Sequence, residues 1–295
     1  MRNWLFKWGI PGLSPVAAIS ALVRFGALMI AGLLVNPQAA VAAVQRGSGY
    51  GFPEDFSVHG HRIDWLIEIT GIFVLLLFVI MVAWMAYSMV KHGRSHTAEY
   101  DHGDTRHHVV IALVISMVIF IVVDGNLFYW AVKDLNEVFW NSEAAQAEGA
   151  VRVEVNAHQW AFDFRQAGPD GVFQTPDDII ALNELVVPAG RPVVFQLASV
   201  DVIHAVYLPN FRMKQDAVPG TINWTWFHPR EDAVGEYDLA CAEHCGISHY
   251  KMKSLLRVLP NAEYERWAAD ASALSQRAFD PDDVDAHWGW EWQEI

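Results

Sequence analysis

Residues 241–252 read Cys-Ala-Glu-His-Cys-Gly-Ile-Ser-His-Tyr-Lys-Met and contain both cysteines of the 295-residue chain. Cys241 and Cys245 are four residues apart, His249 follows four residues later, and Met252 three residues after that. Thiolate, imidazole and thioether groups are the ligands that suit copper far better than magnesium or calcium. This stretch therefore predicts a copper site.

Two cysteines at this spacing can place two sulfurs between two metal ions. Two copper ions bridged by two thiolates then need one histidine each, and Met252 can fill a weak axial position. His249 is the one suitably placed histidine nearby, so we expect the second to come from an earlier loop. His204, in the segment Asp-Val-Ile-His at residues 201–204, is the natural candidate.

A disulfide and a zinc site are the alternative interpretations of the two cysteines. An exported domain permits a disulfide, but a disulfide leaves His249 and Met252 without a role. Zinc sites normally use two Cys-x-x-Cys-like pairs or Cys and His at knuckle spacing, and a methionine ligand argues against zinc. The full set of two cysteines, two histidines and one methionine favours copper.

The pattern C-x-E-x-C-G-x-x-H-x-x-M, preceded by D-V-x-H and K-Q-D-A-V-P-G, resembles subunit II of the haem–copper cytochrome c oxidases. The resemblance runs over about residues 63–260. It implies a dinuclear copper centre, CuA, that takes electrons from cytochrome c. Oxygen reduction, coupled to proton translocation, would take place in subunit I. The implied copper ligands are His204, Cys241, the backbone carbonyl of Glu243, Cys245, His249 and Met252.

The resemblance also implies partners for this chain. These are subunit I, which carries haem and CuB, together with subunit III and a basic cytochrome c. The side chain of Glu243 resembles the family's ligand to a magnesium ion at the boundary with subunit I. The segment Lys-Gln-Asp-Ala-Val-Pro-Gly at residues 214–220 matches one that packs against subunit I.

Trp160, in the segment His-Gln-Trp at residues 158–160, resembles the aromatic residue that lies between bound cytochrome c and the copper in that family. The alternative is an ordinary buried tryptophan of a strand. Asp201 matches an acid of the family's cytochrome c docking face. Asp163 is the candidate for a second docking acid.

The formal charge of −14 is unevenly distributed along the chain. Residues 1–132 contain 8 basic and 8 acidic side chains, whereas residues 133–295 contain 12 basic and 26 acidic ones. An acidic domain on a neutral anchor disfavours nucleic acid and suits a basic protein partner.

Two apolar runs predict a transmembrane hairpin in the lipid bilayer. Residues 69–90 are 22 residues without a charge, enough to cross a hydrocarbon core of about 30 Å as a helix. A second run at residues 109–130 contains Asp-Gly-Asn at residues 124–126 near its far end. We place the two spans at about 66–90 and 109–131, within a hairpin region at residues 43–140.

Residues 1–42 are expected to be a signal peptide. Three basic residues precede an apolar run at residues 25–35, and Ala-Val-Ala at residues 40–42 is a small-x-small cleavage candidate. The apolar run is too short to span a bilayer alone. We favour cleavage; an uncleaved anchor is the alternative.

Residues 150–260 show a strand-like pattern instead. Valines alternate with polar residues from 151 to 156, and further apolar or alternating runs separated by turns occur at residues 179–187, 193–197, 222–227, 237–240 and 254–258. Short strands without intervening helices predict an antiparallel sandwich or barrel. The resemblance implies a cupredoxin-like Greek-key β-barrel.

The expected fold class is therefore membrane α plus all-β, a two-helix hairpin followed by the copper-binding barrel. Residues 261–295 are expected to form a helix and an acidic tail with three tryptophans. Two alternative functions remain at this stage: the CuA subunit of a nitric oxide reductase, and a copper-binding membrane protein without a catalytic partner. The side chain of Glu243 and residues 214–220 argue against copper storage. Both make sense as contacts to a second subunit, and neither is needed to store copper.

The loop between the two spans, residues 91–108, contains three basic residues and is expected to be cytoplasmic. The copper domain then lies on the periplasmic side of a bacterial inner membrane. A reporter fused within this loop should report a cytoplasmic location, and one at the C-terminus a periplasmic location. Both reporters on the same side would contradict the two-span topology.

Overall fold

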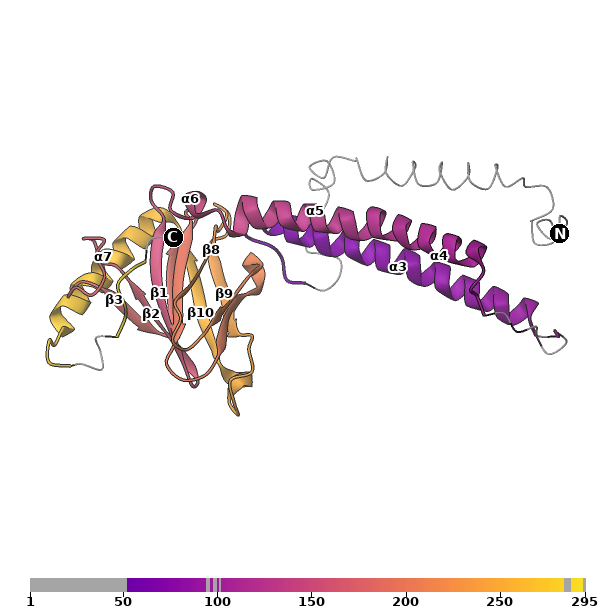
Figure 1. Ribbon diagram of the computed structural model, residues 1–295. Helices are drawn as coiled ribbons and strands as arrows, with labels where there is room; N and C mark the ends of the chain where they lie inside the picture. Colours follow the sequence, from indigo (N-terminus) through magenta and orange to yellow (C-terminus); the bar gives the residue numbers. More distant parts are fainter. Residues whose placement is uncertain (1–51, 94–95, 98–99, 101, 284–287, 294–295) are drawn as a thin grey trace. The chain divides into compact units, whose positions relative to one another are not determined.

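The computed structural model describes residues 52–93, 96–97, 100, 102–283 and 288–293 (Figure 1). The expected signal peptide at residues 1–42 lies outside the described residues. The chain divides into two compact units. The described part of the first unit is residues 65–133, and the second unit contains residues 52–64 and the described residues from 134 onwards.

Two long apolar helical stretches follow one another in the chain. The first is α3 (Gly60–Lys91). The second runs without a break through α4 (Arg106–Ile119), the π-helical turn η1 (Phe120–Asp124), α5 (Gly125–Asp134) and the π-helical turn η2 (Leu135–Phe139). Both stretches are long and apolar enough to span a membrane. Each is longer than the predicted span because its helical hydrogen bonding continues into flanking polar residues.

Local sequence explains details of the second stretch. The hydroxyl of Thr105 accepts a hydrogen bond from the backbone N–H of His108 at 3.4 Å, which caps the start of α4. The polar residues at 124–126 do not break the helix; they coincide with the end of the π-helical turn η1 and the start of α5. The rings of Trp65 and Trp130 meet edge to face at 5.3 Å.

Ten strands form the two sheets of the second unit (Figure 1). One sheet has the strand order β3-β2-β1-β5-β8 and the other β4-β10-β9-β6-β7. The strands are β1 (Val151–His158), β2 (Ala161–Gln166), β3 (Ile179–Leu182), β4 (Glu184–Pro188), β5 (Val193–Ser199), β6 (His204–Leu208), β7 (Met213–Ala217), β8 (Asn223–Phe227), β9 (Gly235–Cys241) and β10 (Lys253–Leu259).

The strand pairing is mainly antiparallel, with parallel pairs only between β1 and β5 and between β4 and β10 among the described strands. Four of the eight described strand pairs join strands that are not consecutive in the chain, as expected for a cupredoxin-like sandwich. The predicted fold class, apolar helices followed by an all-β domain, is confirmed.

Residues 179–187, which the sequence predicted as one run, form two strands in different sheets. Asn183 lies between them in the left-handed conformation, with φ of 56°. Its Oδ1 accepts hydrogen bonds from the backbone N–H of Phe162 at 2.9 Å and from the hydroxyl of Ser254 at 3.2 Å. Because these partners belong to opposite sheets, Asn183 fixes the point where the chain crosses between them.

Alternate side chains of the strands fill the space between the sheets. Val153 and Val155 of β1, Phe164 of β2, Leu197 of β5 and Leu256 of β10 are almost fully buried there. This apolar layer continues to Cys241 at the end of β9 and to Cys245 in the loop that follows, and both belong to the same buried cluster. The core therefore supports the candidate metal centre directly.

Helix α7 (Asn261–Ala278) packs on β3 and β4. Its Tyr264 is buried in the core cluster and donates a hydrogen bond from its hydroxyl to Oε1 of Gln166 in β2 at 3.0 Å. The helix thus covers the end of the sandwich where β3 and β4 lie.

Candidate metal centre

The candidate centre combines the start of β6 with the loop that joins β9 to β10. His204 is the first residue of β6 and Cys241 the last residue of β9. These strands are neighbours, and Val206 lies opposite Cys241. The backbone N–H of Cys241 donates to the carbonyl of Met252 at 3.1 Å, which closes the loop at its base. Strand pairing therefore brings together residues that are 37 positions apart.

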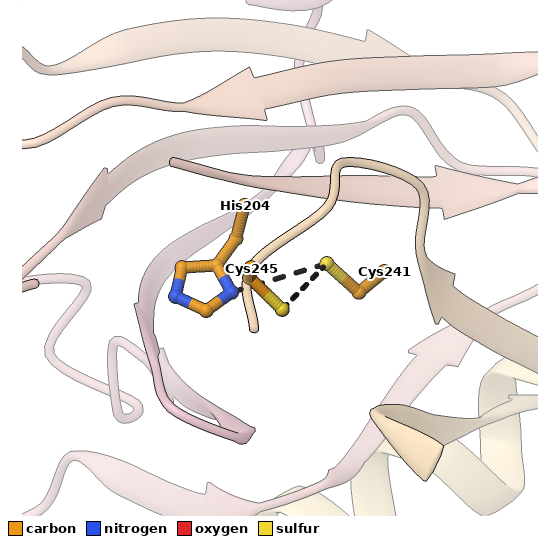
Figure 2. Close-up of side chains that lie close together, drawn as sticks. All are labelled: His204, Cys241 and Cys245. Atoms are coloured by element: carbon orange, nitrogen blue, oxygen red, sulfur yellow. Dashed lines mark hydrogen bonds between the residues drawn. The ribbon is translucent and has the colours of Figure 1, made fainter. Parts of the chain in front are cut away.

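Figure 2 shows His204, Cys241 and Cys245 converging on one point. The two Sγ atoms are 3.8 Å apart, and Nδ1 of His204 lies 3.9 Å from Sγ of Cys241. The three ligand atoms all lie within 4.8 Å of one another. Both cysteines are free, and their separation is about twice the length of a disulfide bond.

Three further donors complete the cluster. Nδ1 of His249 is 3.5 Å from Sγ of Cys245, and Sδ of Met252 is 3.7 Å from the same sulfur. The carbonyl oxygen of Glu243 is 3.3 Å from Sγ of Cys241. Each thiol thus has one imidazole beside it, and the structure brings all six donors named from the sequence into one cluster.

The donor chemistry fits copper. His204, both cysteines and Met252 are buried, and His249 is half-buried. Burial, followed by the neighbouring thiol of Cys241, raises the pKa of Cys245 to about 11. A bound metal would replace this thiol proton. Two sulfurs, two imidazoles and a thioether match copper, because zinc does not favour thioethers and magnesium and calcium prefer oxygen.

Asp201 holds the ring of His204 in one orientation. Its Oδ1 accepts a hydrogen bond from Nε2 of His204 at 2.9 Å, and its Oδ2 accepts one from the backbone N–H of Gln159 at 2.7 Å. Burial alone would raise the pKa of Asp201, but its hydrogen bonds to His204, Val202 and Gln159 outweigh burial and hold that pKa below its usual value. With the proton on Nε2, Nδ1 of His204 is available to a metal.

Trp160 lies against the metal-binding loop. Its indole Nε1 donates to the carbonyl of Cys245 at 3.2 Å, and Nε2 of Gln159 donates to the same oxygen at 2.8 Å. Trp160 is 38% exposed, so it is not the buried strand tryptophan of the alternative interpretation. Gln159 was not predicted as a site residue from the sequence. Its position next to Trp160 in the chain is the signal that could have indicated it.

Gly246 is required by this close approach. Its φ is +121°, a conformation that residues with a side chain rarely adopt. A Cβ at this position would lie 2.9 Å from Nε2 of Gln159 and 3.3 Å from the ring of Trp160. The glycine that follows Cys245 thus lets the loop contact both side chains.

Asp163 lies apart from the donor cluster. Its Oδ2 is 3.2 Å from Nε2 of His158, and its side chain is 21% exposed. Burial raises the pKa of Asp163, and the neighbouring His158 opposes this shift. A partly buried carboxylate with its own partner offers less charge to a docking protein than an exposed one does.

The exposed side chain of Glu243 faces the segment that the sequence singled out at residues 214–220. Nζ of Lys214 is 3.9 Å from Oε2 of Glu243 and 2.7 Å from Oδ1 of Asp216. All three side chains are more than 40% exposed. The two features that sequence reasoning linked to a second subunit therefore lie next to each other.

The part of the chain that contains the donor cluster is similar in sequence to known proteins. The family described as "Cytochrome C oxidase subunit II, periplasmic domain" matches residues 172–258. The alternative cytochrome c oxidase subunit 2 of Bradyrhizobium diazoefficiens is 28% identical over 229 residues, which cover 70% of this chain and 78% of the relative. Cytochrome c oxidase subunit 2 of Cereibacter sphaeroides is 40% identical over 87 residues, 30% of this chain and 28% of that protein.

Among solved structures, the periplasmic domain of subunit II of cytochrome oxidase from Bradyrhizobium japonicum is similar at a TM-score of 0.37 and 27% identity. The similarity covers 44% of this chain and 96% of that domain. The family match includes both cysteines and the rest of the donor cluster. Residues 172–258, which include the whole donor cluster, are therefore similar to the periplasmic domain of cytochrome c oxidase subunit II.

Proposed function

We propose that this chain is subunit II of a cytochrome c oxidase. Its copper centre accepts single electrons from cytochrome c and passes them to haem in subunit I, where oxygen is reduced and protons are translocated. The observation that carries this proposal is the convergence of two thiols, two imidazoles, one thioether and one backbone carbonyl at one end of a rigid sandwich. The chain performs no oxygen chemistry itself.

The metal ligands are, on this proposal, His204, Cys241, the carbonyl of Glu243, Cys245, His249 and Met252. Two copper ions held there would supply reversible one-electron transfer. The chain's own contribution is to fix the donors: Asp201 orients one imidazole, and the hydrogen bond between Cys241 and Met252 closes the loop. Donors held by paired strands move little when the charge of the site changes, which favours rapid electron transfer.

Trp160 is proposed as the residue through which the electron arrives. One part of its indole is exposed to solvent, and its N–H is bonded to the carbonyl of Cys245, a proposed copper ligand. This arrangement gives a short connected path from the surface to the metal. The 26 acidic and 12 basic side chains of residues 133–295 would attract a basic cytochrome c over about a Debye length, roughly 8–10 Å.

The partner subunits and the membrane location also belong to this proposal. Subunit I would contact residues 214–220, subunit III would belong to the same complex, and the side chain of Glu243 would bind magnesium at the boundary with subunit I. The two apolar helical stretches would anchor the chain in the inner membrane of a bacterium, with the copper domain in the periplasm. The domain boundaries expected from the sequence, residues 43–140, 150–260 and 261–295, are part of the same proposal.

Two other functions use the same donors: a CuA subunit of a nitric oxide reductase, and a copper-binding membrane protein that acts alone. The exposed group formed by Lys214, Asp216 and Glu243 favours a partner subunit over storage, since none of these side chains is needed to hold copper. Purification together with an oxygen-consuming haem subunit would separate the oxidase from both.

The first prediction concerns metal content. The full chain should bind two copper ions, and Cys241→Ser or Cys245→Ser should lose the dinuclear centre because each removes one of the two thiolates that would hold it. Met252→Leu should keep both ions but shift the reduction potential, because a thioether ligand would tune it. Metal analysis and potentiometry measure both effects. Met213→Leu, at another buried methionine, is the control and should change neither. One copper ion per native chain would rule out the proposed centre.

The second prediction separates docking from electron transfer. Trp160→Phe should leave the affinity for cytochrome c and its salt dependence unchanged but slow the transfer step, because the indole contact to Cys245 is lost. Asp163→Asn should weaken binding slightly and flatten its salt dependence while leaving the transfer step unchanged; the effect should be small because Asp163 is partly buried beside His158. Asp201→Asn would be ambiguous, since Asp201 also holds His204.

Stopped-flow reduction by cytochrome c at several ionic strengths measures both effects. Trp267→Phe on α7 is the control and should leave both quantities unchanged. If Trp160→Phe alters affinity while the transfer rate stays the same, the assigned role of Trp160 is wrong.

The third prediction tests the placement of Trp160. Gly246→Ala should displace the indole, because the new methyl group would meet the ring of Trp160 and Nε2 of Gln159. Electron transfer from cytochrome c should slow as it does in Trp160→Phe. Gly171→Ala is the matched control: its φ is also positive, at 69°, but its nearest contact is an ordinary 3.9 Å to Arg152. Equal effects of the two changes would show that backbone strain, and not the contact with Trp160, is responsible.

A further inference from the structure

A row of polar side chains crosses the outer face of the sheet β3-β2-β1-β5-β8, opposite the core. Arg165 of β2 lies opposite Glu154 of β1, which in turn lies opposite Gln196 of β5. Outer faces of antiparallel sheets commonly contact water. These three residues are instead 1%, 0% and 1% exposed. Another part of the chain must therefore cover them.

The cover is the C-terminal segment Trp-Gly-Trp-Glu-Trp-Gln, residues 288–293. Oε1 of Gln196 accepts hydrogen bonds from the indole Nε1 of Trp290 at 3.2 Å and from the backbone N–H of Gln293 at 3.1 Å. Nε2 of Gln196 donates to the carbonyl of Gln293 at 2.5 Å. One buried amide thus binds both the backbone and a side chain of the segment, which is a specific mode of recognition.

The segment passes directly over the Glu154–Arg165 pair. The ring centroid of Trp288 is 4.5 Å from the guanidinium carbon of Arg165, a cation–π contact. The backbone N–H of Trp290 donates to the carboxylate of Glu154. Gly289 lies between them with φ of +135°, and a Cβ there would collide with both charged side chains. This glycine is therefore required by its conformation and by its contacts.

Trp292 anchors the far end of the segment. Its ring stacks on Phe173 with centroids 5.0 Å apart and planes 10° apart, and the guanidinium of Arg152 lies 5.7 Å from the ring centroid. It also packs against the small buried cluster that contains Val194 and Trp226. Each of the three tryptophans thus has its own place on the sheet.

The covered charge cluster contains more acid than base. Glu154 and Asp178 each lie 3.4 Å from a guanidinium nitrogen of Arg165, and all three side chains are at most 4% exposed. Oε1 of Glu154 has no hydrogen-bond partner within the described part of the chain. A buried carboxylate with an unpaired oxygen favours its protonated form.

We propose that this face is a binding site for the chain's own C-terminal segment, and that the Glu154–Arg165–Asp178 cluster takes up a proton when the segment closes over it. The site would act as a proton-linked latch on the copper domain. It is separate from the donor cluster and does not depend on the metal.

The groups that face Glu154 determine the direction of the linkage. The pKa of Glu154 is raised to about 7: burial and the neighbouring Asp178 raise it, and Arg165 and the N–H of Trp290 lower it. Burial likewise raises the pKa of Asp178 to about 6, with Asp177 adding to the shift and Arg165 opposing it. With the segment released, Glu154 meets water and its pKa returns toward its usual value. The closed form therefore binds more protons, and closure weakens as the pH rises from about 4.5 to about 7.

Hydrogen exchange of the full chain in its membrane complex, measured by mass spectrometry and corrected for intrinsic rates, tests this proposal. At about pH 6 the amides of residues 288–293 should be protected, and their protection should fall by up to about tenfold per pH unit as the pH rises toward about 7. Glu154→Gln keeps the shape but cannot ionise, so it should remove most of this pH dependence. Glu236→Gln, an exposed acid in the other sheet, is the matched control and should leave the dependence intact.

Gly289→Ala tests the site itself. It should abolish protection of residues 288–293 at about pH 6 and at about pH 7. The amides of β9 and β10 should stay protected, which would show that the sandwich remains folded. Gly220→Ala is the control, because Gly220 also has a positive φ, of 76°, but nothing lies within 4 Å of its added Cβ; it should leave the segment protected. Unprotected residues 288–293 at about pH 6 in the native chain, or full protection in Gly289→Ala, would overturn the binding site. A native pH dependence in Glu154→Gln would overturn the proton linkage.

Discussion

The pairing of β6, β9 and β10 is the constraint on which the candidate metal centre depends. It sets His204 beside Cys241 and, through the hydrogen bond from Cys241 to the carbonyl of Met252, fixes both ends of the loop that holds Cys245 and His249. The apolar core directly behind the cysteines keeps this end of the sandwich rigid. A metal bound there would meet donors that are already in place, and this suits electron transfer better than ligand exchange.

The β1–β2 hairpin connects the candidate metal centre with the covered charge row. Its turn carries Gln159 and Trp160, which hold the carbonyl of Cys245, and its strands carry Glu154 and Arg165 beneath the C-terminal segment. Asp201 contacts this turn as well as the proposed ligand His204. Asp201, which the sequence suggested as a docking acid, therefore also positions residues inside the site.

Sequence reasoning succeeded where chemistry is encoded locally and failed where distant segments meet. Cys241, Cys245, His249 and Met252 could be named because soft ligands at this spacing are typical of copper and of few other metals. The carbonyl of Glu243 was named from the family resemblance alone. The crossover at Asn183 was missed, because a single Asn between two apolar runs, without Gly or Pro, is a weak turn signal. β7 was missed because Lys214 and Asp216 lie at an exposed sheet edge and give no apolar alternation. The position at which the acidic, tryptophan-rich tail binds could not be predicted either. It depends on outward-facing residues of three strands that are far apart in the sequence.

The central claim is that the six donors hold two copper ions that share one unpaired electron. Electron paramagnetic resonance of the copper-loaded, oxidised chain tests it most directly, because hyperfine coupling counts the copper nuclei that the electron contacts. The account predicts coupling to two equivalent copper nuclei, with the signal lost in Cys245→Ser. Coupling to a single copper nucleus in the native chain would contradict it.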